Sequence, residues 1–254
     1  LYPARTLMTV AKRYRLRGDS PCIDQGECGV ADSADLDGDG LTSEILSRDF
    51  TDDLRQIDDL LSPNGGAPTG GLADMGACEH HRPRTVLVNH AATGANNGTT
   101  WTDAYVNLQS AIAELAALPP GETPEIWVAQ GTYKPTTGSD PLASFVPPPS
   151  TSILGGFAGG ERSRSLRNWR THPTILSGEL GPAGPTGNSR HVVRFIGGSS
   201  LIDGFVIRDG VAIASEGGGG VRADAGASAR VYHCVITANT GDGPGSGVAC
   251  VGGN

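Results

Sequence analysis

Residues 191–237, HVVRFIGGSSLIDGFVIRDGVAIASEGGGGVRADAGASARVYHCVIT, come close to repeating themselves, and this near-repeat indicates the type of fold. Phe205 and Cys234 lie 29 residues apart in equivalent short apolar runs, and Val192 and Val221 are separated by the same number of residues. A period in the high twenties that contains several short strands indicates a solenoid, in which each turn buries its apolar face only against neighbouring turns.

Glycine runs continue a similar period toward the end of the chain. The segment GGGV at 218–221 returns 27 residues later as GSGV at 245–248. A β-sandwich also contains short strands and frequent turns, but it does not require glycine runs to recur in register. The repeat therefore favours a solenoid over a sandwich.

Short runs of the same kind extend back toward the middle of the chain. Apolar segments that end in glycine or a polar turn stand at EIWVAQGTY (125–133), SILGGF (152–157) and TILSGEL (174–180). The 254 residues include 38 glycines and 17 prolines but only 5% aromatic residues. This composition disfavours a helical bundle and predicts an all-β fold of short strands.

One segment, residues 101–118, has the periodicity of an amphipathic helix. Its apolar residues recur at spacings of three and four: Tyr105, Leu108, Ile112 and Leu115. Asp103 lies near the expected start, and the Pro-Pro-Gly run at 119–121 ends the segment. Because the helix precedes the strand repeats, we expect it to be an N-terminal cap that covers the exposed edge of the first turn.

The chain is expected to contain two parts, with a boundary near residue 82. Residues 1–82 are loop-rich and acidic, whereas residues 83–254 hold the helix and the strand repeats. His80 and His81 mark the junction between them. A metal-binding histidine pair is the less favoured interpretation there, because no further ligands follow at a metal-site spacing.

Several segments of the second part resemble the start of large secreted bacterial proteins that contain a right-handed parallel β-helix. They are VLVNHAATGANNGTTWTDAYVNLQSAIAEL (86–115), EIWVAQGTYKPT (125–136), ILGGFAGGE (153–161), RNWRTHPTILSGEL (167–180), NSRHVVRFIG (188–197) and LIDGFVIRDG (201–210). The resemblance implies a β-helix with an N-terminal cap and a location outside the cell or at its surface. It implies little about activity, because fold does not determine function.

Segments of the first part resemble the ends of the same proteins, where a terminal domain precedes a surface-anchoring signal. They are KRYRLRGDSPCIDQG (12–26), DLDGDG (35–40) and LADMGACE (72–79). The order is therefore reversed, with ending motifs first and starting motifs second. Either two β-helices follow one another in a longer protein, or the open C-terminal turn of one copy docks on the N-terminal region of the next. The second arrangement is a head-to-tail contact that propagates into a filament.

The acidic run at 35–44, DLDGDGLTSE, is the sharpest candidate metal site. Asp35, Asp37 and Asp39 alternate with other residues in a loop turned by glycine, and Glu44 is a candidate late ligand. Such oxygen-rich loops suit Ca²⁺, which accepts six to eight hard ligands. The match to an EF-hand is incomplete because Leu46 stands at the twelfth position. A solvated acidic turn is the alternative.

A carbohydrate-active enzyme is the alternative to a non-catalytic protein, because polysaccharide lyases and hydrolases also use parallel β-helices. Such chemistry needs a base near an acidic sugar or paired carboxylates across a glycosidic bond. The candidate residues are Asp203, Arg208, Asp209, Arg190, His191 and Arg194. Nothing in their spacing aligns them as a set, and the resemblance implies a turn-stabilising role for Asp203.

The aromatic and thiol residues have two interpretations each. Trp101, Trp127 and Trp169 are candidates for a carbohydrate-stacking platform, although packing is the favoured role. The five cysteines are Cys22, Cys28, Cys78, Cys234 and Cys250. They are too dispersed for a zinc framework, and they either include a Cys22–Cys28 disulfide or are buried free thiols.

Charge and hydropathy exclude some partners. The formal net charge is −8, which opposes binding to the phosphate backbone of nucleic acids. No apolar run reaches the roughly 18 to 20 residues of a membrane-spanning helix. The opening LYPARTLMTV is too interrupted to be a signal peptide, and we expect the native N-terminus to lie upstream.

These features together predict a non-catalytic structural or adhesive protein of the extracellular space or cell surface. It is expected to bind Ca²⁺, to contact surface glycans and to form a homopolymer through head-to-tail contacts. The alternative is a polysaccharide lyase, a glycoside hydrolase or a glycan-binding module.

Overall fold

The computed structural model describes residues 83–119, 121–181, 187–213, 216–243 and 245–252. The chain divides into two units, Leu1–Arg82 and Pro83–Asn254, and all described residues belong to the second. The expectations for Asp35, Asp37, Asp39 and Glu44 therefore lie outside the described residues, as do those for the two junction histidines and for Cys22, Cys28 and Cys78.

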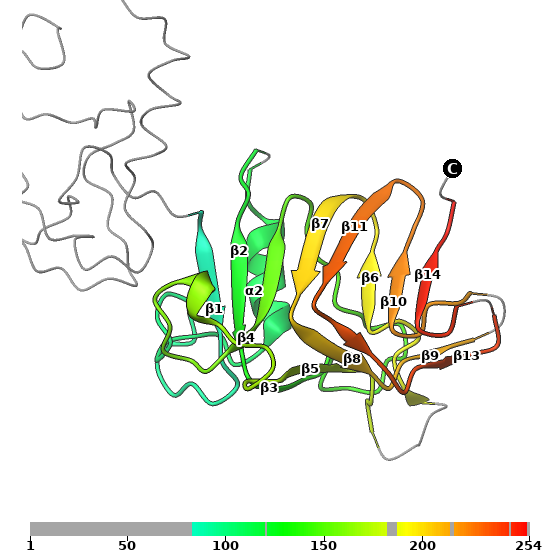
Figure 1. Ribbon diagram of the computed structural model, residues 1–254, viewed down its shortest axis with the longest axis horizontal. Helices are drawn as coiled ribbons and strands as arrows, with labels where there is room; N and C mark the ends of the chain where they lie inside the picture. The colour runs from blue at the N-terminus through cyan, green and yellow to red at the C-terminus, as the bar shows by residue number, and fades with distance from the viewer. Residues whose placement is uncertain (1–82, 120, 182–186, 214–215, 244, 253–254) are drawn as a thin grey trace, which may run out of the picture. The chain divides into compact units, whose positions relative to one another are not determined.

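Parallel strands form the body of the second unit (Figure 1). The largest sheet has five strands in the order β1-β2-β4-β7-β11. Their bounds are Thr85–Val88, Glu125–Ala129, Ser152–Phe157, Gly198–Asp203 and Ala227–Tyr232. Every neighbouring pair in this sheet is parallel, as expected for strands stacked by successive turns of a solenoid.

Two further sheets and a strand pair complete the turns. The four-stranded sheet β12-β8-β5-β3 comprises Val235–Ile236, Phe205–Arg208, Thr174–Ser177 and Gly131–Tyr133. The three-stranded sheet β14-β10-β6 comprises Val248–Cys250, Val221–Ala223 and Val193–Phe195. The pair β13-β9 comprises Thr240–Gly241 and Val211–Ala212.

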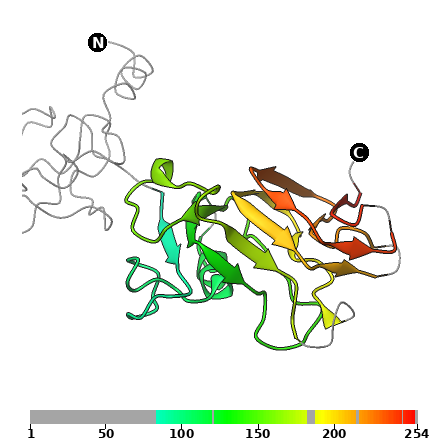
Figure 2. The ribbon, with the colours of Figure 1, turned by 60° about the horizontal axis from the view of Figure 1, so that its bottom comes forward.

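One turn of the chain visits these sheets in sequence. It runs through β7, β8, β9 and β10, and the next turn repeats the path as β11, β12, β13 and β14. In Figures 1 and 2 the chain colours succeed one another across the stacked turns, from cyan β1 to red β14. The predicted fold class, an all-β parallel β-helix with a cap helix, is confirmed.

An aliphatic ladder runs through the interior of the five-stranded sheet. The register aligns Val86, Ile126, Ile153, Ile202 and Val231, one from each strand. The first four are at most 3% exposed, whereas Val231 in the last strand is only half-buried. Burying one such side chain contributes roughly 1.5–3 kcal/mol. The interior is therefore a stack in which each turn covers the one before it.

The predicted offsets are correct for one sheet and wrong by one residue for another. In the four-stranded sheet Val206 pairs with Val235, which is the expected separation of 29. In the three-stranded sheet Val221 pairs with Val193 and not with Val192. Side chains alternate between the two faces of a strand, so a shift of one residue moves each of them to the opposite face. The observed register aligns buried Val193 with buried Val221, whereas the predicted one would place exposed Arg194 opposite an interior residue.

The single α-helix of the described residues, α2 (Leu108–Ala116), lies between β1 and β2 in the chain and closes the N-terminal end of the core. It begins at Asn107, whose side chain accepts a hydrogen bond from Gln109 N at 2.7 Å, and not near Asp103 as predicted. Tyr105 is excluded from the helix because its backbone forms a parallel bridge with Val88. The buried side chains of α2 join the aliphatic core: Leu108, Ala111, Ile112 and Leu115.

The free edge of β1 is covered by the segment before the helix and not by the helix itself. Leu87 N donates to Gly98 O at 2.9 Å, and Leu87 O accepts from Tyr105 N at 2.9 Å. Asn89 N also donates to Tyr105 O at 2.8 Å. The cap thus has two parts, because residues 98–105 satisfy the strand edge while α2 covers the apolar interior.

The last turn of the described residues has no such cover. Strands β11, β12 and β14 are formed of exposed or half-buried residues throughout. Large apolar side chains exposed at this end are Tyr232 at 51%, Val235 at 57%, Val248 at 47% and Val251 at 41%. The residues that would face a further turn therefore face solvent in the second unit.

Helix length bears on the predicted absence of a membrane span. Among the described residues, no helix has both the length and the apolar character that crossing a bilayer requires.

Candidate functional site

The outward face of the five-stranded sheet changes character along the solenoid. The residues aligned across it, one per strand, are Leu87, Trp127, Leu154, Asp203 and Tyr232. The first three are buried, although they point away from the aliphatic ladder, and Tyr232 is exposed. The early turns of this face are therefore covered and the late turns are open.

An aromatic cluster covers the early turns. Trp127 stacks on Phe157 with ring centroids 4.9 Å apart, and the tilted ring of Trp101 has its centroid 5.6 Å from that of Phe157. Trp101 Nε1 donates to Glu161 O at 2.9 Å. These two tryptophans pack in the fold, which is the favoured of the two interpretations.

A tight loop fixes the start of the segment that follows β4. The carboxylate of Glu161 accepts hydrogen bonds from the backbone amides of Ala158 at 2.6 Å, Gly159 at 3.0 Å and Gly160 at 3.0 Å. Burial alone would raise the pKa of Glu161, but these amides outweigh it and hold the pKa below the ordinary value. Glu161 is therefore an anchor for the loop that leads toward Trp169.

The loop then returns onto β4 at a glycine. Asn168 N donates to Gly156 O at 2.7 Å, and Gly156 has a φ of 90°. A Cβ at this position would lie 2.6 Å from both the Cα and N of Trp169. Only glycine permits this close approach, which places Trp169 and its neighbours over the sheet.

Arg167, Asp203, His233 and Trp169 form a connected cluster at the open part of the face. Arg167 Nη2 donates to Asp203 Oδ2 at 2.6 Å, and both side chains are nearly buried. His233 Nδ1 lies 2.8 Å from Asp203 Oδ1. The ring of Trp169 contacts that of His233 at 4.2 Å, and the guanidinium of Arg167 lies 5.2 Å from the Trp169 ring.

A groove lies beside this cluster, with a volume of about 430 Å³. Its lining residues are Ser152, Leu154, Arg164, Ser165, Arg167, Trp169, Leu201 and Asp203. One wall is the 3₁₀-helix η1 (Arg164–Leu166) with the loop that follows it, and the floor belongs to β4 and β7. Arg164 Nη1 donates to Glu125 Oε1 at 2.8 Å, so the guanidinium is held at the rim of the groove.

The neighbouring strand, β11, carries two exposed polar side chains beside the groove. The register places Arg230 next to Leu201 and Tyr232 next to Asp203. Both side chains are exposed. Neither forms a hydrogen bond, ion pair or ring contact with any residue that the structure describes. They are available to a ligand.

The role expected for Asp203 is wrong in its detail. Its carboxylate does not stabilise its own turn through backbone N–H groups among the described residues, but binds Arg167 and His233. These partners come from the loop after β4 and from the residue after β11. Asp203 therefore connects three segments of the solenoid.

The six candidate catalytic residues lie on three different sheets. Asp203 ends β7, whereas Arg208 and Asp209 lie at the end of β8, where Arg208 Nε is 3.2 Å from Asp209 Oδ2. Asp209 Oδ2 also accepts from Ser177 Oγ at 2.8 Å. The other three, Arg190, His191 and Arg194, lie in or just before β6.

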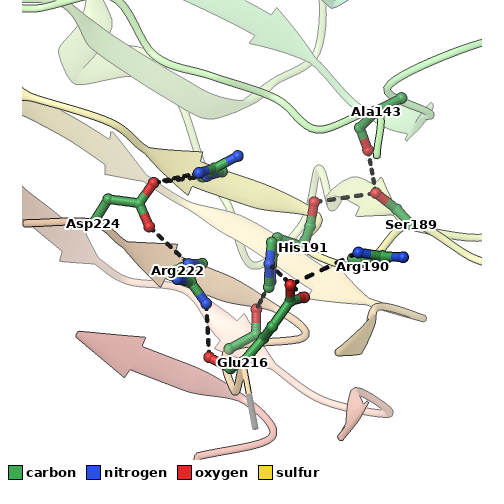
Figure 3. Close-up of polar contacts among 9 residues, drawn as sticks. Ala143, Ser189, Arg190, His191, Glu216, Arg222 and Asp224 are labelled. Atoms are coloured by element: carbon green, nitrogen blue, oxygen red, sulfur yellow. Dashed lines mark hydrogen bonds and ion pairs between the residues drawn. The ribbon is translucent and has the colours of Figure 1, made fainter. Parts of the chain in front are cut away.

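The residues before and in β6 form a separate charged cluster (Figure 3). His191 Nδ1 lies 3.0 Å from Gly218 O, and its Nε2 lies 3.6 Å from Glu216 Oε2. Arg190 is 3.7 Å from Glu216. Burial lowers the pKa of His191, a residue that is 7% exposed, and nearby guanidinium groups also lower it. The associated cavity is only about 80 Å³.

Asp224 joins this cluster to the ladder of arginines on the three-stranded sheet. It accepts from Arg222 Nε at 2.7 Å and from Arg194 Nε at 2.8 Å, and these arginines are aligned on neighbouring strands. Burial alone would raise the pKa of Asp224, but the two guanidiniums outweigh it and lower the pKa. The carboxylate thus neutralises a like-charged pair, which is a structural role.

Within the described residues, no group of three or more His, Cys, Asp or Glu side chains is placed to hold a metal ion. The two cysteines of the second unit, Cys234 and Cys250, are free thiols there. Burial raises the pKa of the Cys234 thiol.

Comparison of the chain with protein-family models, with curated proteins and with solved structures finds no match in any of the three.

Sequence reasoning singled out Asp203 and Trp169 separately but missed their contacts with Arg167 and His233. The repeat could have indicated the contact between Asp203 and His233, because the offset that aligns Phe205 with Cys234 also aligns Gly204 with His233. The contact of Arg167 had no such signal, since its loop interrupts the repeat. Gly204, with a φ of 85°, leaves room for the guanidinium, because a Cβ there would lie 2.8 Å from Arg167 Nη1.

Proposed function

We propose that this protein is a non-catalytic structural or adhesive element of the extracellular space or cell surface, and that it assembles head-to-tail. The observation that carries the proposal is the contrast between a covered first turn and an uncovered last turn. At the last turn, β11 presents a strand edge that pairs with no other described strand, and the neighbouring strands expose apolar side chains such as Val235 and Val248. An edge of this kind is a template for pairing with another chain.

Head-to-tail assembly also accounts for the reversed order of the sequence motifs. Residues 1–82 resemble the end of a β-helix, so they are suited to complete the last turn of a neighbouring copy. A contact between different surfaces of identical chains propagates and does not close on itself unless the rotation permits a ring. The result is a filament built from β-helical segments.

Electron microscopy of the full chain at increasing concentration tests this assembly, with sedimentation velocity as a solution measurement. We expect uniform filaments whose length increases with concentration. Val248 is 47% exposed although it aligns with buried Val221, so Val248→Lys places a charge at an interior position of the uncovered end and should abolish the filaments. Ile196→Lys is the control, because Ile196 is 58% exposed but does not lie on the last turn. Monodisperse short rods at every concentration would contradict the proposal.

We further propose that Asp35, Asp37, Asp39 and Glu44 bind Ca²⁺ and stabilise the first unit. Alternating carboxylates around glycines supply the hard oxygen ligands that this ion prefers. Thermal unfolding in calcium and in chelator tests the site. We expect calcium to raise the melting temperature of the full chain and Asp37→Asn to remove the effect. Equal melting under both conditions in the unsubstituted protein would contradict calcium binding.

A carbohydrate-directed function is the second candidate, and the groove over β4 and β7 favours it. The groove combines an aromatic ring, guanidinium groups and a carboxylate, which is the side-chain chemistry that carbohydrate sites use. Catalysis is tested by incubating the protein with acidic and neutral polysaccharides and measuring new reducing ends. Product formation that Asp203→Asn abolishes would favour the enzyme. Binding without product formation would favour an adhesive role.

A further inference from the structure

The geometry points to a carboxylate-bearing saccharide as the ligand of the groove over β4 and β7, with Arg230 as the residue that receives the carboxylate. This inference deepens the adhesive part of the proposed function and rests on it. It does not depend on head-to-tail assembly, because every residue of the groove and its rim belongs to the second unit.

The size and construction of the groove suit a small ligand. Its volume of about 430 Å³ lies within the roughly 300–1,000 Å³ that is usual for small-molecule sites. The floor is apolar at Leu154 and Leu201, and hydroxyl groups lie at its border, from Ser152 on the floor and Ser165 on the wall. An apolar floor with hydroxyls at its border matches a sugar ring, whose faces are apolar and whose edges carry hydroxyl groups.

The wall of the groove is already rigid without a ligand. Arg167 is held by Asp203 and by Gly155 O at 3.0 Å, and Trp169 is held against His233. These contacts fix the side chains before a ligand arrives, so little conformational entropy is lost on binding. The cluster therefore shapes the site, whereas other residues must supply the interactions that select the ligand.

Charge distinguishes an acidic saccharide from a neutral one. The guanidiniums of Arg164 and Arg167 each have a carboxylate partner, in Glu125 and Asp203. Arg230 has none among the described residues, although it lies beside Leu201 at the border of the groove. A free guanidinium presents a planar fork of donors that matches a carboxylate. Arg230 is therefore the residue that we expect to bind the carboxylate of the ligand.

Tyr232 supplies the second selective contact. Its side chain is 51% exposed and lies beside Asp203 in the register, two residues from Arg230 on the same outward face. Aromatic rings offer a flat apolar surface together with a polar tip. A sugar ring seated on the groove would meet this ring while its carboxylate meets Arg230.

Isothermal titration calorimetry of the full chain tests the inference with defined oligosaccharides. The probes are trimers to hexamers of galacturonate, glucuronate-containing hyaluronan and alginate, each compared with its methyl ester. The ester keeps the sugar and removes the charge. We expect at least one free acid to bind and its ester to bind about tenfold more weakly or worse, the effect of losing a charge-assisted hydrogen bond. Affinity should fall with salt, since the contact is exposed.

Two variants locate the contact. Arg230→Gln should weaken binding of the free acid about tenfold and leave binding of the ester unchanged. Tyr232→Ala should weaken binding of both. Because both residues are exposed, thermal melting should not change. Lys134→Gln is the matched control, since it removes one positive charge from the end of β3 on the four-stranded sheet, and it should bind as the unsubstituted protein does.

Three results would overturn the inference: no acidic oligosaccharide binds at millimolar concentration, acid and ester bind equally, or Arg230→Gln binds the acid normally. Electron microscopy of the same samples separates this failure from failure of the proposed function. Filaments without saccharide binding would remove the ligand and leave the structural role. Saccharide binding without filaments would remove the assembly and leave the adhesive role.

Discussion

The two ends of the solenoid are built from the same parallel ladder but are finished differently. At the first turn, residues 98–105 bond to the free edge of β1 and α2 fills the end of the core. At the last turn described, β11 has an unpaired edge, and Val231 and Ile236 contact the core on one side only. Stability is thus concentrated where a turn is covered from both sides.

This difference shows that a repeat does not encode its own ends. Strand runs with a constant period specify stacking, but they leave a backbone edge at each end. Closing the first edge required features outside the repeat, such as Gly98 with a φ of 74° and the helix N-cap Asn107. No equivalent features appear at the other end of the described residues.

The largest expected effect comes from one substitution made at both ends. Val88 in β1 is fully buried, whereas Val248 in β14, which aligns with buried Val221, is 47% exposed. Val88→Ala removes buried methyl groups and leaves a cavity, so it should lower the free energy of unfolding by about 2–3 kcal/mol. Val248→Ala should lower it by about 1 kcal/mol or less. Urea denaturation measures both, and equal losses would show that the two ends are equally covered.

A smaller effect is expected at the start of the cap helix. Asn107→Ala removes the side-chain acceptor for Gln109 N and should cost about 1 kcal/mol of unfolding free energy. Asn107→Ser is the control, because its hydroxyl also caps helices and should restore most of the loss. If alanine and serine give the same stability in urea denaturation, the cap does not depend on this hydrogen bond.

The loop anchored by Glu161 should make the covered part of the outer face sensitive to acid. Its pKa is lowered in the folded state, so its contribution to stability is present above the ordinary value near 4.5 and is lost as pH falls through the lowered value. Glu161→Gln should lower the unfolding free energy at neutral pH by less than about 1 kcal/mol, because the carboxylate is partly exposed and solvent screens it.

Thermal melting across the acid range measures this effect. The melting temperatures of the glutamine variant and the unsubstituted protein should converge as the pH falls below 4.5. A constant difference at all pH values would mean that the charge of Glu161 does not hold the loop.

The smallest difference concerns two thiols in the last turn. Cys234 is half-buried and burial raises its pKa, whereas Cys250 in β14 is exposed. The thiolate is the reactive form, so iodoacetamide near pH 8 should alkylate Cys250 about tenfold faster or more. Peptide mass spectrometry resolves the two sites. Equal rates would show that the last turn opens readily and that its residual burial is transient.

Sequence reasoning predicted the fold because the repeat reports stacking directly. The separation of Phe205 and Cys234 gave the register of the four-stranded sheet. The predicted register of the three-stranded sheet was wrong by one residue at Val192. Two buried valines adjoin there, and spacing alone does not identify the one that pairs with Val221. The helix start was also wrong, because long-range pairing of Tyr105 with Val88 overrides its place in the helical pattern.

The candidate site was predictable only in part. The period aligned the Asp203 turn with His233, but the loop that brings Arg167 and Trp169 over the sheet has no counterpart in the described residues of the other turns. Its position depends on Gly156 and on the amide bonds of Glu161, which are local features of one insertion. Periodicity reports the features that the turns have in common, so it does not reveal a site that is formed by a loop specific to one turn.

The covered edge of β1 gives the solenoid a direction of growth. With the backbone of Leu87 and Asn89 already bonded to residues 98–105, a new strand has no place to add on that side. Extension of the ladder is restricted to β11, whichever chain supplies the strand. In a head-to-tail assembly, each new strand would therefore join the ladder at β11 of a preceding copy, and a molecule bound to β11 would block that step.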